Sequence, residues 1–120
     1  MAKILFVDDE PDIGVLVTKI LEEDGHEVRW VFSAQECYGM MDDYCPDLVI
    51  MDIFMPGENG VEAARWIKER YPHIPVLMFS IMYSTRDIEE AMQISGADDF
   101  LGKPFDRAEL LERVENLTKR

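Results

Sequence analysis

Apolar residues recur along the chain in four short runs, at residues 4–7, 48–51, 76–79 and 100–101. Continuous apolar character without polar alternation is typical of strands that are covered on both faces in a parallel sheet. A fifth run, EVRWVF at residues 27–32, alternates charged and apolar side chains. Because only one face of this run is apolar, it favours an edge strand.

Helical periodicity lies between these runs. Two stripes of apolar residues have helical spacing, namely Ile13, Leu16, Val17, Ile20 and Leu21 near the start and Leu110, Leu111, Val114 and Leu117 near the end. Two further helices are expected over residues 59–70 and 85–95. The helix boundaries are indicated by Pro11 in a first turn, by capping boxes of Ser33 with Glu36 and of Asp106 with Glu109, and by Gly25 after a helix end.

The alternation of strands and helices predicts an α/β fold with a doubly wound parallel sheet. Parallel strands joined by helices need right-handed crossovers, which place helices on both faces of the sheet. A sheet of five strands favours the flavodoxin-like order 2-1-3-4-5. In such sheets ligands bind beyond the carboxyl ends of the strands, where the order reverses between the first and third strands.

Length and charge exclude several classes of protein. The chain has 120 residues, which fits a single domain with its own core. Its 25 acidic and 12 basic residues give a net charge of −13, which repels nucleic-acid phosphates and anionic membranes. The N-terminal residues have the pattern of neither a signal peptide nor a membrane span. We therefore expect a cytoplasmic protein that binds neither nucleic acid nor membranes directly.

Polar side chains follow the apolar runs at the expected carboxyl edge. Asp8 and Asp9 come after the first run, Asp52 after the third, Ser80 after the fourth and Lys103 after the last. Each has an ordinary explanation when taken alone; Asp8 and Asp9, for example, are also good helix caps. Because the fold brings all of these groups to one edge of the sheet, their joint occurrence favours a functional site.

The residue types indicate the chemistry of that site. Three neighbouring carboxylates raise one another's pKa unless a cation shares the site. Oxygen ligands without His or Cys favour Mg²⁺ or Ca²⁺ over zinc, and so few carboxylates, which leave room for waters and a phosphate, favour Mg²⁺, with Mn²⁺ as a substitute. A divalent cation and an ammonium group together can neutralise a phosphoryl group in transfer, and a carboxylate can accept that group. Asp52, the central carboxylate, is the candidate nucleophile.

Four pieces of sequence carry a resemblance to a known family. They are VDDE at residues 7–10, MDIFMPGENG at 51–60, Ser80 after the fourth apolar run, and DDFLGKPF at 98–105. Taken together they resemble the receiver domain of two-component response regulators, a phosphoprotein of the chemotaxis-regulator kind. The resemblance covers residues 1–120 as one receiver domain, and we expect no output domain in this chain.

The resemblance implies a phosphoacceptor and a metal site. Asp52 would accept a phosphoryl group from a histidine kinase or a phosphotransfer protein. Asp9, Asp52 and the backbone carbonyl of Phe54 would bind Mg²⁺, and Asp8 would act through a water molecule. Catalysis would be limited to the domain's own phosphorylation and autodephosphorylation, so no separate enzyme activity is expected.

The resemblance also implies a conformational switch. Ser80 would donate a hydrogen bond to the acyl phosphate, Lys103 would pair with it, and Phe100 would rotate inward. Pro104 would follow a cis peptide bond, which proline permits. The face formed by the fourth helix, fifth strand and fifth helix would then change. It would bind an unknown downstream protein or form a phosphorylation-dependent dimer.

Some residues depart from the family's pattern. The family usually has a small residue after the switch hydroxyl, where this chain has Ile81. Phe54 and Met82 occupy positions that flank the phosphoryl group and often carry polar or small side chains. These three side chains would restrict access to the phosphoryl group, and slow autodephosphorylation is the expected consequence.

Gly14 and Val15 lie off the apolar stripe of the first helix and close in sequence to Asp9. We expect them to form part of the surface on which the kinase docks, as the resemblance suggests.

Three other functions remain as alternatives. A degenerate receiver would bind partners without phosphorylation. Ile81 alone makes this function plausible, and the presence of the site residues argues against it, namely Asp8, Asp9, Asp52, Ser80 and Lys103. A magnesium-dependent phosphatase of the haloacid dehalogenase type needs a second acid two residues after the nucleophile, where this chain has Phe54. A flavin-binding protein would need a phosphate loop rich in Ser, Thr and Gly after the first strand, which the sequence lacks.

Overall fold

The structure of the chain, a computed structural model, describes residues 1–55, 58–81 and 84–119. Its elements in chain order are β1 (Lys3–Val7), α1 (Pro11–Glu23), β2 (Glu27–Val31), α2 (Ala34–Tyr44), β3 (Leu48–Asp52), β4 (Phe54–Met55), β5 (Glu58–Asn59), α3 (Gly60–Arg70), β6 (Val76–Ile81), α4 (Thr85–Ser95), β7 (Asp99–Lys103) and α5 (Arg107–Thr118). No helix in the described ranges is long and apolar enough to cross a membrane.

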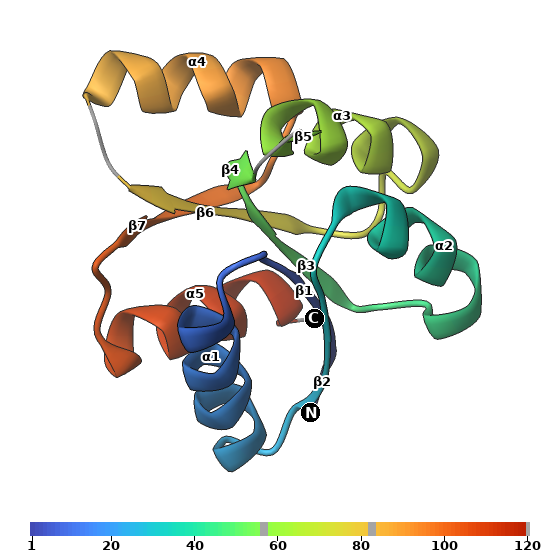
Figure 1. The fold of residues 1–120 in the computed structure, drawn as a ribbon, viewed down its shortest axis with the longest axis vertical. Helices are drawn as coiled ribbons and strands as arrows, with labels where there is room; N and C mark the ends of the chain where they lie inside the picture. The colour runs from blue at the N-terminus through green and yellow to red at the C-terminus, as the bar shows by residue number, and fades with distance from the viewer. Residues whose placement is uncertain (56–57, 82–83, 120) are drawn as a thin grey trace.

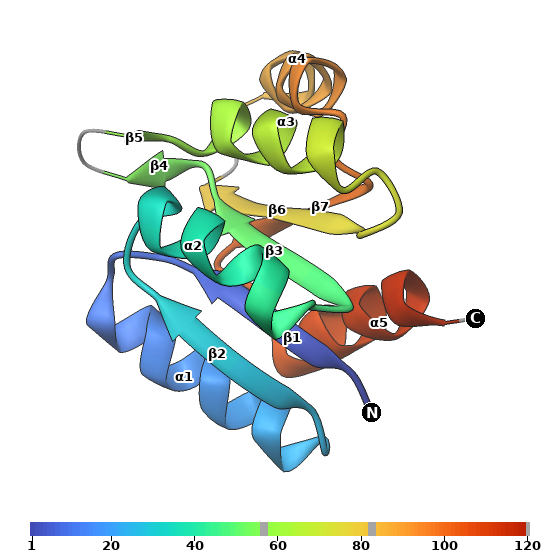
Figure 2. The same ribbon diagram turned by 90° about the vertical axis from the view of Figure 1, so that its right-hand side faces the viewer.

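Five parallel strands form the central sheet in the order β2-β1-β3-β6-β7, which confirms the predicted flavodoxin-like topology. Helices α2, α3 and α4 lie on one face of the sheet and α1 and α5 lie on the other (Figure 2). The strand that alternates in sequence, β2, lies at an edge of the sheet, as expected (Figure 1).

Each face of the sheet buries its own apolar core, which explains the continuous apolar runs. Leu5, Val49 and Met78 point into the core beneath α2 and α3. Phe6 and Phe79 lie in the opposite core with residues of α1 and α5. Their side chains are fully buried, so the central strands are covered on both sides.

The helix starts follow the sequence signals. Pro11 is the first residue of α1, and the Ser33 side chain accepts the backbone N–H of Glu36 at the start of α2. At α5, Asp106 and Glu109 form a complete capping box. These contacts fix where each helix begins relative to the strand before it.

Two features of α1 differ from the prediction. Leu16, which was assigned to the buried stripe, is 47% exposed. Gly14, which was placed off that stripe, is buried, and a Cβ atom added there would lie 1.9 Å from the Trp30 ring. The indole of Trp30, on the neighbouring strand β2, fills the space that a side chain at position 14 would occupy. The buried face of α1 therefore differs from the predicted one: it includes Gly14, which faces β2, and excludes Leu16.

A short hairpin after β3 was not predicted. Strands β4 and β5 pair antiparallel, with Phe54 opposite Asn59. The hairpin leads into α3, whose first turn is capped by the Asn59 side chain, which accepts the backbone N–H of Val61 at 2.9 Å. Two-residue strands leave no periodic signal in the sequence, so no element was expected between Asp52 and the helix over residues 59–70.

Candidate functional site

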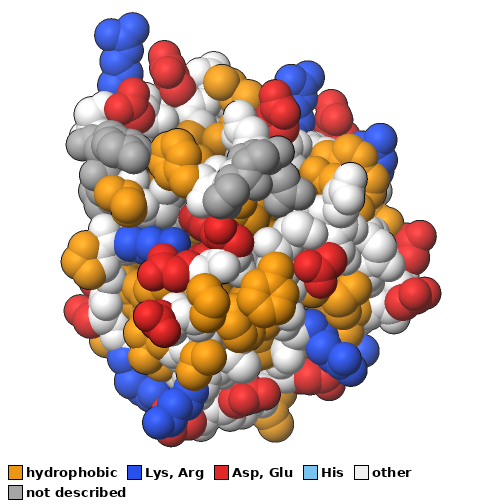
Figure 3. All heavy atoms as spheres, in the orientation of Figure 1, with side chains coloured by type: hydrophobic (Ala, Val, Ile, Leu, Met, Phe, Trp, Pro, Cys, Tyr) orange, Lys and Arg blue, Asp and Glu red, His pale blue; other side chains and the backbone are white. Residues whose placement is uncertain are grey.

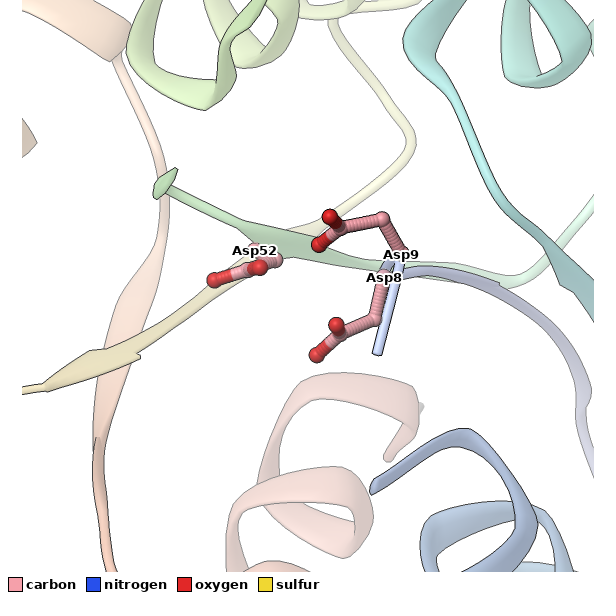
Figure 4. A group of neighbouring side chains, drawn as sticks. All are labelled: Asp8, Asp9 and Asp52. Carbon is pink, nitrogen blue, oxygen red and sulfur yellow. The ribbon is translucent and has the colours of Figure 1, made fainter. Parts of the chain in front are cut away.

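Three carboxylates meet at the carboxyl edge of the sheet. Asp52 is the last residue of β3, and Asp8 and Asp9 follow β1, its neighbour in the sheet. One carboxylate oxygen from each of the three lies within 4.8 Å of the others. Figure 4 shows the Asp8 and Asp9 side chains pointing toward the same side, where the carboxylate of Asp52 lies. The predicted acidic cluster is therefore present.

Lys103 brings a positive charge to this cluster from β7, two strands away from β3. Its Nζ atom lies 3.1 Å from Asp8 Oδ2 and 3.5 Å from Asp52 Oδ1. Asp8 is fully buried and the Lys103 side chain is 16% exposed, so water screens these ion pairs weakly. One ammonium group thus contacts two carboxylates that lie far apart in the sequence.

Burial perturbs the central carboxyl group. Its removal from water and the negative charge of Asp8 raise the pKa of Asp52 to about 6, although Lys103 and the backbone N–H of Phe54 act in the opposite direction. Asp52 is only 4% exposed. Ionisation of this carboxyl group costs free energy. Binding of a cation, or a covalent bond from the carboxylate oxygen to another group, would lower that cost.

The alternative assignment of Asp8 and Asp9 as helix caps can be tested directly. The residue that caps α1 is Glu10, which makes no side-chain capping bond, and Pro11 follows it. Asp8 accepts the backbone N–H of Glu10 at 2.9 Å and so stabilises the turn before the helix. Its other carboxylate oxygen is the one that pairs with Lys103. Asp8 and Asp9 therefore belong to the acidic site, and neither of them caps α1.

The donor set fits a hard divalent cation. The cluster offers oxygen ligands from three carboxylates, against the single ammonium group of Lys103 that contacts it in the described part of the chain. A metal of the Mg²⁺ class would supply the missing positive charge. Asp8, Asp9 and Asp52 are the residues that would hold it.

Comparison with known proteins agrees with this geometry. Residues 4–115 match the family model described as the response regulator receiver domain. The chain belongs to this receiver domain family. The transcriptional regulatory protein TrcR of Mycobacterium tuberculosis is 34% identical over 98% of this receiver chain, which spans 46% of the length of TrcR.

Solved structures show the same fold at closely similar geometry. NtrX from Brucella abortus superposes with a TM-score of 0.91 and 37% identity over 98% of this receiver chain, which covers 27% of the NtrX chain. The chemotaxis protein CheY4 of Vibrio cholerae also gives a TM-score of 0.91, with 28% identity and 98% of both chains covered. This chain is thus similar both to part of a longer chain, that of NtrX, and to nearly the whole of a chemotaxis protein.

Ser80 and Phe100 occupy neighbouring strands of the receiver sheet. Ser80 is 1% exposed, and its hydroxyl oxygen has no hydrogen-bond partner among the described atoms. Phe100 on β7 is partly buried against the core beneath α2 and α3. Both line a cavity of about 530 Å³ that also contacts α3 and α4. An unpaired buried hydroxyl costs free energy, so Ser80 gains from a new acceptor.

The side chains expected to control access lie at the surface. Phe54 is 56% exposed and Ile81 is 57% exposed, on the two segments that follow Asp52 and Ser80. Met82 lies outside the residues that the structure describes. The cis peptide bond between Lys103 and Pro104 is present, as expected.

Of the two residues expected to dock the kinase, Val15 is 61% exposed. Gly14 cannot contribute an exposed surface, because the ring of Trp30 covers it.

Two contacts near the site were missed by the sequence analysis. Trp30 donates its indole N–H to the backbone carbonyl of Asp8 at 2.9 Å and so ties β2 to the acidic loop. Gly60 packs so closely that an added Cβ would lie 2.0 Å from the backbone oxygen of Asp52. Gly60 falls at the start of the helix expected over residues 59–70, but nothing in the sequence indicated its close approach to Asp52.

Proposed function

We propose that residues 1–120 act as a single phosphorylation-activated switch of a two-component system. In this proposal Asp52 accepts a phosphoryl group from a histidine kinase or a phosphotransfer protein. The observation that carries it is the meeting of Asp8, Asp9, Asp52 and Lys103 from three parallel strands at one edge of the sheet. Membership in the receiver family supports the same function.

The transfer step is a nucleophilic substitution at phosphorus. A carboxylate oxygen of Asp52 attacks, a bond between phosphorus and that oxygen forms, and the bond between phosphorus and the donor histidine nitrogen breaks with its electron pair on nitrogen. Because the pKa of Asp52 is about 6 in the metal-free protein, most molecules carry the required carboxylate at neutral pH. Mg²⁺ at the acidic cluster would neutralise charge on the phosphoryl oxygens.

Lys103 and Ser80 are the chain's own groups for stabilising the product. The Lys103 ammonium group already lies 3.5 Å from Asp52, so a small movement away from Asp8 would bring it to a phosphoryl oxygen. The Ser80 hydroxyl, which lacks a partner among the described atoms, would donate a hydrogen bond to another. Hydrolysis reverses the modification, since water attacks the acyl phosphate and releases inorganic phosphate and the free carboxylate.

Energetics require several contacts to act together in the switch. Moving a population from mostly inactive to mostly active takes roughly 5.5 kcal/mol of differential stabilisation. A charge-assisted hydrogen bond from Ser80 contributes about 1.5–3 kcal/mol. The Lys103 contact and fuller burial of Phe100 would contribute the rest. The face formed by α4, β7 and α5 would change and bind a downstream protein or a second copy of the chain.

Intact-mass spectrometry tests the proposal. The protein is incubated with Mg²⁺ and acetyl phosphate, and the expected result is a gain of one phosphoryl group that disappears with chelation and in Asp52→Ala. Absence of any gain, repeated with histidine kinases as donors, would support a degenerate receiver that binds partners without phosphorylation. Turnover of an aromatic phosphate ester would instead indicate a phosphatase.

A further inference from the structure

An apolar groove lies between α3 and α4, on the face of the sheet opposite to α1 and α5. The two helices lie side by side in both ribbon views (Figures 1 and 2). The groove has a volume of about 530 Å³, and its apolar lining comes mainly from Phe54, Val61, Ile88, Ala91, Ile94 and Phe100. We call it the α3–α4 groove.

The apolar face of α4 is incompletely covered by the rest of the domain. Ile94 is 55% exposed, and Ile88 and Ala91 are only partly buried. Among the residues of α4, Ser95 alone is fully buried. A helix of globular proteins normally turns such a stripe into the core, so this one is available to another molecule.

Acidic and basic side chains both lie over α3 and α4 (Figure 3), but the charged residues that line the groove are acidic. Its charged lining residues within the described ranges are Glu62, Asp87 and Glu90, all acidic. Arg86 approaches Glu90 at 4.0 Å, but that side chain is 88% exposed, and such a surface pair offsets little of the negative charge. An apolar floor with an acidic rim complements a ligand that is apolar in its centre and basic at its margins.

The backbone around the groove favours a helical ligand over an added strand. The groove lies over the face of the sheet that α3 and α4 cover (Figure 2), and β6 beneath it is paired on both sides, with β3 and β7. Strand addition needs a sheet edge, and β7, the edge strand, contributes only Phe100 to the lining of the groove. The walls are two helices, between which an amphipathic helix can lay one apolar face. We propose that the α3–α4 groove binds a basic amphipathic helix of a partner protein.

This surface is distinct from the face of α4, β7 and α5 that the proposed function assigns to output, although α4 borders both. Ser80 and Phe100 line the groove from below, so a bound helix would contact the residues of the proposed switch. Binding does not require phosphorylation, since the groove is present in the unmodified protein. An Asp52→Ala variant is therefore expected to bind as the native protein does, which separates this inference from the proposed function.

The test uses a synthetic helical peptide of about four turns. It carries Leu and Phe at helical spacing on one face and Lys and Arg on the flanks, with a fluorescent label for anisotropy. A second peptide has the same apolar residues and Glu in place of every Lys and Arg. We expect the basic peptide to bind, the acidic peptide to fail, and amide resonances of α3, α4 and β6 to shift in NMR spectra when the basic peptide is added.

Matched variants locate the binding. Ile94→Asp, in the groove, is expected to weaken binding of the basic peptide by about tenfold or more. An isoleucine side chain that becomes buried on binding contributes that much to affinity. Leu16→Asp replaces a similarly exposed residue on α1 and is expected to leave affinity unchanged. The double variant Glu62→Lys and Glu90→Lys should bind the basic peptide more weakly than the native protein does, and it should bind the acidic peptide.

Three results would overturn the proposal. They are an absence of binding, equal weakening by Ile94→Asp and Leu16→Asp, and basic-peptide binding that survives the double charge reversal. The last would indicate general attraction to a chain of net charge −13. Concentration-dependent dimerisation that Ile94→Asp abolishes, without peptide binding, would assign the groove to a second copy instead.

Discussion

Lys103 lies closer to Asp8 than to Asp52, with Nζ 3.1 Å from the Asp8 carboxylate and 3.5 Å from that of Asp52. In the unphosphorylated protein the ammonium group is therefore held mainly by Asp8, and less closely by Asp52, the proposed acceptor. Phosphorylation would add charge on the Asp52 side and draw Lys103 toward it. The shared lysine thus links the charge state of the site to the end of β7.

Removal of this ammonium group should destabilise the metal-free protein. Lys103→Met leaves buried carboxylates without their cation and raises the pKa of Asp52 further, and breaking such a pair costs about 3 kcal/mol. Urea unfolding at pH 8 should show this loss, and Mg²⁺ should restore part of it. The control is Lys68→Met. The native Lys68 side chain is as buried as that of Lys103, at 16% exposure, but it pairs with Asp98 instead. A loss in Lys103→Met that Mg²⁺ does not reduce would contradict the account.

Asp52 should give the stability of the metal-free protein a defined pH dependence. Its pKa is about 6 in the folded protein and 3.8 for an aspartate side chain in water, so the folded state binds more protons between these pH values. The native protein therefore loses stability from this group as pH rises from about 4 to about 6, and the loss is complete above that range. Asp52→Asn removes the titration and should be more stable by about 3 kcal/mol at pH 8.

The gain in Asp52→Asn should fade as the pH falls toward 4. Urea unfolding of both proteins across this range, in the presence of a chelator, measures the difference directly. A gain of the same size at pH 4 and pH 8 would mean that ionisation of Asp52 is not its source. Added Mg²⁺ should stabilise the native protein more than the variant, since it binds the ionised carboxylate.

The close packing of Gly60 against the end of β3 should make this position intolerant of any side chain. A Cβ there would meet the backbone oxygen of Asp52 at 2.0 Å, so Gly60→Ala must displace the start of α3 or the end of β3. We expect a loss of about 1–3 kcal/mol or more in the free energy of unfolding. Gly39→Ala is the control, because position 39 is open and helical, and it should gain about 0.5–1 kcal/mol. Equal effects of the two substitutions would show that Gly60 is not tightly packed.

Phe54 should slow hydrolysis of the acyl phosphate by shielding it from water. It follows Asp52 by two residues and its side chain is 56% exposed at the mouth of the site. Phe54→Asn should hydrolyse severalfold faster, measured as loss of phosphoprotein after removal of the donor. Phe32→Asn, at an exposed phenylalanine after β2, serves as the control. An unchanged rate in Phe54→Asn would remove shielding as the explanation for a long phosphoryl lifetime.

The acidic site could be predicted from sequence because strand periodicity and strand order determine it. Asp8, Asp52 and Lys103 each stand at the end of an apolar run, and parallel strands end at one edge of a sheet. The same reasoning predicted the five-strand order. Contacts between elements were harder to predict, because they depend on which residues of two elements face each other.

Gly14 illustrates that limit. Helical spacing placed it off the buried stripe, whereas the large indole of Trp30 covers it from β2 and leaves Leu16 exposed. The hydrogen bond from that indole to Asp8 was equally invisible in a linear pattern. The α3–α4 groove likewise depends on how far α4 stands from the sheet, which periodicity alone does not specify.

Locating the phosphoryl group on the chain tests the central claim most directly. The protein is phosphorylated with acetyl phosphate and Mg²⁺, the acyl phosphate is reduced with borohydride, and peptides are sequenced by mass spectrometry. Reduction converts a phosphorylated aspartate into homoserine and leaves free aspartates unchanged. The account predicts homoserine at position 52 and intact aspartate at positions 8 and 9. Homoserine at either of those positions, or at none of the three, would contradict it.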